Sequence, residues 1–208
     1  MQIANIKTSH DWQQTKQKLV AGSIPAFKAL FREHPLQSIR AIGYTWEWGQ
    51  PQAAFYCVAN TQAGLERALI DVNRYRPEPL SAAGALETVR WDAGYFPFPG
   101  GLVGPNDELG VEWEAEADRL HAMTEAMMAV DTNDDVAYAE YSRNYEAFLA
   151  SLVTVCCKAL AEIAAAGHLG DYLDIDFWVG STDENGDIVK SRDARIRQLI
   201  EDEKQAAS

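Results

Sequence analysis

Alternating apolar and polar residues predict an antiparallel hairpin in the first third of the chain. From Ile42 to Trp48, large apolar side chains occupy every second position, whereas residues 53–59 are apolar at nearly every position. The first pattern is typical of a strand with one buried face, and the second of a strand covered on both faces. A glycine and a proline between the two segments favour a turn, so the strands are expected to pair with each other.

Helical periodicity predicts helices on both sides of this hairpin. Residues 11–33 carry apolar side chains at helical spacing, but Gly22-Ser23 and Pro25 interrupt the pattern, so two short helices are expected. After the hairpin, Asn60 or Thr61 provides a cap for a helix with one apolar stripe. Residues 73–106 are rich in proline and glycine and are predicted to be mostly loop, with a brief strand or helical turn around residues 86–95. A loop of this length is unusual in a compact domain and is often a binding feature.

Two amphipathic helices are predicted in the second half of the chain. The first begins at Asp107, and its inward stripe consists of residues three or four positions apart, namely Trp113, Ala117, Leu120, Thr124 and Met127. The second is the longest, starting at a capping-box-like Thr132-x-x-Asp135 and running to about Ala166, with Gly167 as its cap. Because the connection between them is short, the two helices are expected to pack antiparallel.

The C-terminal region is predicted to form a second hairpin and a helix. Residues 173–179 alternate like a strand, Asn185-Gly186 favours a type I′ turn, and residues 188–189 are expected to return as the partner strand. Ser191 then stands where it can cap a final helix. The order of elements indicates a single α+β domain over residues 1–208, with a mainly antiparallel sheet packed with several helices, including one long helix.

Composition adds that the chain is globular and soluble. Of its 208 residues, 47% are hydrophobic and 24% charged, and no apolar run approaches the roughly 18 residues of a membrane span. The first ten residues lack the pattern of a signal peptide, so a cytoplasmic location is expected. Three cysteines, two of them the adjacent Cys156 and Cys157, fit a reducing compartment better than a disulfide framework.

Charge is concentrated in the middle of the chain. Residues 107–140 contain eleven carboxylates and a single basic residue, Arg119, so this window carries −10 of the formal net charge of −13. A field of this sign repels nucleic-acid backbones and anionic lipids, and it attracts basic proteins or cations. The charge therefore predicts a basic protein partner and argues against binding to nucleic acid or to a membrane.

Candidate partner-binding residues come from the acidic helix and from the loop that precedes it. Glu112, Glu116 and Asp118 are expected on an exposed acidic face. Trp91 and Tyr95 are aromatic residues of the kind that anchor protein interfaces. Exposed aromatic residues also suit pairing with a second copy, which leaves a homo-oligomer as a further interpretation.

Catalytic chemistry has weaker support in the residue pattern. Glu114, Asp118, His121 and Glu125 recur on one side of the predicted acidic helix, where a divalent metal could bind. Di-metal helical proteins, however, repeat Glu-x-x-His on two helices, and here the related pattern ending at His121 occurs once. The alternative hypothesis is a metal-dependent or small-molecule-processing enzyme with a site between the Pro/Gly-rich loop and the acidic helix. No catalytic, metal or cofactor-binding residue is assigned, and no cofactor is expected.

Three short segments invite comparison with known families, namely residues 174–183 (DIDFWVGSTD), 91–95 (WDAGY) and 53–61 (AAFYCVANT). With His34-Pro35 ahead of the strand pair, they resemble a bacterial family of cytosolic α+β proteins classed as a domain of unknown function. The C-terminus departs from that family, with Arg197-Gln198-Leu199 in place of a Leu-Asn ending. Some members are regarded as candidate toxin-immunity proteins, so the resemblance implies that the basic partner is a toxin. It implies no catalytic residues.

Overall fold

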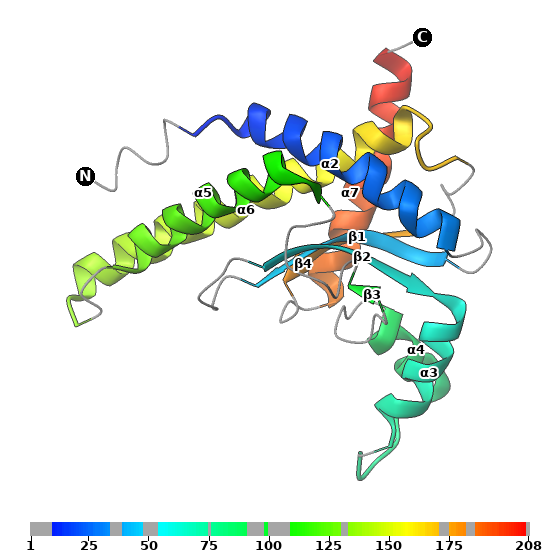
Figure 1. The fold of residues 1–208 in the computed structure, drawn as a ribbon. Helices are drawn as coiled ribbons and strands as arrows, with labels where there is room; N and C mark the ends of the chain where they lie inside the picture. Colours follow the sequence, from blue (N-terminus) through cyan, green and yellow to red (C-terminus); the bar gives the residue numbers. More distant parts are fainter. Residues whose placement is uncertain are drawn as a thin grey trace.

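The fold is α+β, with one small mixed sheet and helices that include one long helix (Figure 1). The computed structural model describes residues 10–33, 39–47, 54–74, 76–90, 98–99, 109–129, 133–170, 175–181 and 186–206. The fold class and the long helix are as predicted, whereas the predicted arrangement of the sheet is wrong.

The sheet has the strand order β3-β2-β1-β4. β1 (Ile39–Glu47) and β2 (Ala54–Thr61) pair antiparallel, which confirms the predicted N-terminal hairpin. β3 (Phe98–Pro99) contributes two residues at one edge. β4 (Asp176–Ser181) lies parallel to β1 on the other side, so the sheet is mixed rather than mainly antiparallel. β4 enters the sheet only after four intervening helices, and its direction is therefore not set by a local turn.

The predicted C-terminal hairpin is wrong, because residues 188–189 belong to a helix. α7 runs from Gly186 to Ala206, so it begins before Ser191, and Asn185 lies outside the described residues. Val189, Ile196 and Ile200 are all buried, and their spacing of seven and four residues is helical. The β-branched pair at 188–189 suggested a strand, but the apolar stripe that continues from it fits only a helix.

α2 (Trp12–Glu33) is one continuous helix rather than the two short helices predicted. Its small residues serve packing. A Cβ atom on Gly22 would stand 2.2 Å from the backbone oxygen of Leu109, so only glycine permits this approach. The Tyr44 hydroxyl donates a 2.7 Å hydrogen bond to Ser23. Burial of the helix on both sides of Pro25 outweighs the backbone hydrogen bond that proline removes.

α3 (Gln62–Val72) and α4 (Ala82–Arg90) form a small separate packing unit. The Thr61 hydroxyl accepts a hydrogen bond from the Gly64 amide, which confirms the predicted cap. Within the stretch predicted to be mostly loop, residues 82–90 form a helix. The buried residues of the pair are Ala68, Val72, Ala85 and Val89.

α5 (Val111–Met128) and α6 (Asp135–Ala165) are the predicted amphipathic pair. All five residues of the predicted α5 stripe are buried. α6 is capped by Asp134, whose carboxylate accepts hydrogen bonds from two backbone amides, and Thr132 lies outside the described residues. Gly167 has a φ of 75°, which suits its predicted place just after the helix.

α6 is long and apolar enough to cross a membrane by length and composition. In the folded chain, however, its apolar residues join the core, where Leu152, Cys156 and Leu160 are fully buried. This burial is consistent with a soluble protein. The three cysteines are free and buried, and the sequence had not predicted their burial.

β4 is buried on both faces, although the residues of this segment alternate in the sequence. Phe177 and Val179 join the main core, whereas Trp178 packs with Ala41, Val58 and Val189 on the other side. Asp176, at the start of β4, forms two 2.6 Å hydrogen bonds with the Arg90 guanidinium. Its carboxylate is therefore paired and mostly shielded, with 13% of the side chain exposed.

Candidate partner-binding site on the helical arm

α5 and the first half of α6 lie side by side and project from the sheet (Figure 1). We call α5 together with residues 135–147 of α6 the arm, and residues 125–140 its tip. The inner stripe of α5 faces the core, which leaves the opposite side of the helix in solvent. Glu112 and Asp118 lie on that exposed side, as the sequence predicted.

Glu116 is buried, with none of its side chain exposed, and it does not belong to the acidic surface. Its carboxylate accepts hydrogen bonds from Thr15 at 2.6 Å, from Lys18 at 2.8 Å and from Arg119 at 2.6 and 2.7 Å. Thr15 and Lys18 belong to α2, so this carboxylate ties the arm to the body of the protein. The sequence contained a signal for this burial, because residue 116 falls inside the apolar stripe that runs through 113, 117 and 120.

His10 completes the cluster. Its Nε2 lies 2.8 Å from the Thr15 hydroxyl and 3.5 Å from the Glu116 carboxylate, and 4% of its side chain is exposed. Because the single hydroxyl hydrogen of Thr15 points to Glu116, the His10 Nε2–H must donate to the Thr15 oxygen. Trp12 covers the His10 ring edge-on at 4.4 Å between ring centroids.

The cluster shifts the pKa values of both titratable groups. Burial alone would raise the pKa of Glu116, but hydrogen bonds from Arg119, Lys18 and Thr15 outweigh it and lower the pKa to about 2. Burial, followed by the nearby Arg119 guanidinium, lowers the pKa of His10 below its usual value. Glu116 is therefore charged and His10 neutral at pH 7.

A hydroxyl, an imidazole and a carboxylate in contact are also the parts of a nucleophilic catalytic site. Thr15, however, is fully buried, and so is the Glu116 carboxylate. No substrate reaches a hydroxyl in that position. The cluster is best understood as a structural junction that fixes the arm on α2.

The tip of the arm combines negative charge with exposed apolar side chains. No lysine or arginine occurs between Arg119 and Arg143. Glu125, Asp134, Asp135 and Glu140 are exposed at the tip. Three large apolar side chains are exposed beside them, Met128 at 44%, Val136 at 76% and Tyr138 at 51%. The sequence located the charge but missed Met128 and Val136, because the exposure of an apolar side chain depends on how the two helices pack.

Aromatic rings continue from the tip along α6. Tyr138, Tyr141, Tyr145 and Phe148 form a row with successive centroid distances of 6.0, 5.8 and 6.5 Å. The row grades from an exposed tyrosine to the buried Phe148, which contacts Trp12 at 5.7 Å. Tyrosines in this setting offer flat surfaces with little rotamer entropy to lose on binding.

The remaining predicted site residues give a mixed result. Trp91 and Tyr95 lie outside the described residues, as does most of the Pro/Gly-rich loop. His121 approaches Glu125 at 3.5 Å on α5. Among the residues that the structure describes, no group of three or more histidine, cysteine, aspartate or glutamate side chains is placed to hold a metal ion. The metal-site interpretation of Glu114, Asp118, His121 and Glu125 thus gains no support from the described part of the chain.

Comparison with known proteins finds no match to a family model, to a curated protein or to a solved structure.

Proposed function

We propose that this protein binds a basic protein partner through the tip of its arm. The observation that carries the proposal is the coincidence of exposed carboxylates, in a segment without lysine or arginine, with exposed Met128, Val136 and Tyr138 at one end of the molecule. Most exposed apolar side chains on a soluble protein occur singly, and a group of them marks a contact surface. Aromatic and methionine side chains are also enriched in protein interfaces.

The two components of the tip have different physical roles. Carboxylates attract a basic surface from a distance and raise the association rate, and at physiological ionic strength they act over about 8 Å. The apolar side chains act only after contact, when their burial slows dissociation. A second copy of this chain is a poor occupant, because two tips of the same charge repel each other. Only the family resemblance suggests that the basic partner is a toxin.

The test compares three proteins in affinity capture from a lysate of the host cell, followed by kinetics with the purified partner. The arm variant carries Glu125→Lys and Glu140→Lys, both at exposed tip positions. The control carries Glu201→Lys and Glu203→Lys, the same change of charge at exposed positions near the end of α7. We expect the wild type and the control to retain the same basic protein, and the arm variant to associate with it at least about tenfold more slowly at low salt.

The anchor side chains need a separate variant. Tyr138→Ala should leave the association rate nearly unchanged and should raise the dissociation rate by about tenfold or more. The proposal is refuted if the partner retained by the wild type is acidic, or if it binds the arm variant as fast as the control.

A further inference from the structure

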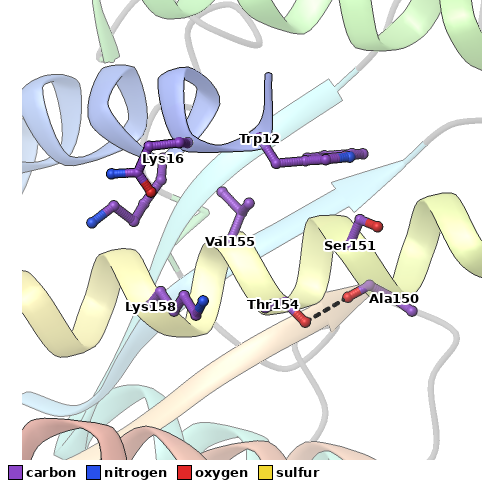
Figure 2. A pocket seen from close by; sticks show the side chains of 8 residues that line it. Trp12, Lys16, Ala150, Ser151, Thr154, Val155 and Lys158 are labelled. Atoms are coloured by element: carbon purple, nitrogen blue, oxygen red, sulfur yellow. Dashed lines mark hydrogen bonds between the residues drawn. The ribbon is translucent and has the colours of Figure 1, made fainter. Parts of the chain in front are cut away.

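A cavity of about 380 Å³ lies between the start of α2 and the middle of α6 (Figure 2). Its volume falls within the range of small-molecule sites, which is about 300–1,000 Å³. The arm and its partner make no use of this cavity, because its lining comes from residues 12–16 and 150–158. It therefore calls for an explanation separate from the proposed function.

The two ends of the cavity differ in chemistry. Figure 2 shows Trp12 and Ser151 at one end, Lys16 and Lys158 at the other, and Val155 between them. An aromatic and an aliphatic side chain thus lead to two ammonium groups. Among the described residues that line the cavity, both charged ones are lysines, although the whole chain has 31 acidic residues against 18 basic ones.

The two lysines have different surroundings. Lys16 is 16% exposed and pairs with Glu162, which lies just beyond the cavity on α6. Lys158 is exposed and has no hydrogen-bond or ion-pair partner among the residues that the structure describes. An anion at this end would satisfy Lys158 and would share Lys16 with Glu162. The net charge of −13 does not prevent this, because charges more than about 10 Å away are largely screened at 0.1 M salt.

The hydroxyl groups of the lining add no donor to the site. Thr154 and Ser151 donate their hydrogens to backbone carbonyls of α6 at 2.8 Å, so only their oxygen lone pairs face other partners. The donors left to a ligand are the two ammonium groups and the carboxamide of Gln13. A site with cationic donors at one end and an indole ring at the other fits an anionic head joined to a flat apolar body.

We propose that this cavity binds a small organic anion, with its carboxylate or phosphate between Lys16 and Lys158 and its apolar ring against Trp12. The ligand class is defined by the shared chemistry of an aryl carboxylate and an aryl phosphate. The site is independent of the proposed partner surface, and either proposal can fail without the other.

The probes are 2-naphthoate, indole-3-acetate and phenyl phosphate, titrated into the full chain by calorimetry at low salt. The neutral amide of 2-naphthoate has the same shape and serves as the probe control. We expect saturable one-to-one binding of at least one anion, and at least about tenfold weaker binding of its neutral counterpart, since a charge-assisted hydrogen bond is lost.

Variants locate the binding. Lys158→Met removes the exposed ammonium group without touching the core and should weaken anion binding by about tenfold. Lys28→Met makes the same change on the exposed side of α2, outside the cavity, and should leave affinity within about twofold. Trp12→Leu should weaken the binding of every aromatic anion but leave the binding of inorganic phosphate unchanged.

Three outcomes would overturn the proposal. The first is that none of the three anions binds with a Kd below about 10 mM. The second is that the neutral amide binds as tightly as 2-naphthoate, and the third is that Lys158→Met and Lys28→Met weaken binding equally. Circular dichroism and thermal unfolding of each variant confirm that the fold is retained. The site is supported if the Lys158→Met variant stays folded and loses affinity while the Lys28→Met variant does not lose it.

Discussion

Replacing Glu116 with glutamine should remove the carboxylate charge that holds the arm to α2 and should lower the stability of the protein. The carboxylate accepts four hydrogen bonds, two of them from one Arg119 nitrogen, and the cations on either side of it would lose their counter-ion. The shift of the Glu116 pKa from 4.5 to about 2 corresponds to about 3 kcal/mol, at 1.36 kcal/mol for each pKa unit. The side chains of Lys18 and Arg119 are 24% and 45% exposed, so water can solvate these cations and offset part of the roughly 3 kcal/mol. A loss of about 2–3 kcal/mol in unfolding free energy is therefore expected at pH 7.

The same substitution should change how stability depends on pH. The folded-state pKa of Glu116 lies below the unfolded value, so its stabilisation is complete above about pH 5 and is lost as the pH falls toward 2. About two fifths of it should remain at pH 3. Glu116→Gln removes the titrating group, and the difference between wild type and variant should therefore shrink steadily across this window.

The assay is urea unfolding monitored by circular dichroism at pH 7, 5, 4 and 3. Glu114→Gln is the matched control, because Glu114 lies two residues away on the exposed side of α5 and should cost less than about 0.5 kcal/mol. Equal stability of Glu116→Gln and wild type at pH 7 would refute the reasoning. So would a deficit that stays constant from pH 7 to pH 3, because that result would come from packing rather than from charge.

Three further perturbations test other contacts. His10→Asn should flatten the pH dependence of stability between pH 7 and 5, because the depressed pKa of His10 makes folding favour the neutral ring and stability falls below about pH 6.5. Gly43→Ala should cost more than about 3 kcal/mol in urea unfolding or prevent soluble expression, because the new Cβ would stand 1.6 Å from the backbone oxygen of Trp178. Asp176→Asn should cost about 1–2 kcal/mol, because it breaks the two-bond contact with Arg90.

The Gly43 and Asp176 substitutions each have an internal control. Gly84→Ala places a methyl group within the first turn of α4, 3.3 Å from a flexible serine hydroxyl, and should change stability by less than about 1 kcal/mol. Asp202→Asn alters an exposed carboxylate on α7 and should be nearly neutral. If Gly43→Ala behaves like Gly84→Ala, β1 and β4 do not approach as closely as described. If Asp176→Asn behaves like Asp202→Asn, the pair with Arg90 contributes little.

The sequence alone determined the elements whose stability is local. The α5 stripe, the antiparallel pairing of β1 with β2, and the Thr61 cap depend on residues less than about 25 positions apart. Periodicity and turn chemistry report such contacts directly. The acidic window was equally visible, because net charge is a property of composition.

Tertiary structure alone decided which of those features are exposed, paired or joined. β4 lies parallel to β1 because four helices separate the two strands in the chain, so no tight turn fixes its direction. Glu116 is buried because Thr15 and Lys18, about a hundred residues away, supply the hydrogen bonds that offset its desolvation. The cavity between α2 and α6 likewise joins Lys16 to Lys158 across 142 positions. Periodicity describes one element at a time, whereas burial of a charge or the lining of a cavity depends on which distant elements meet.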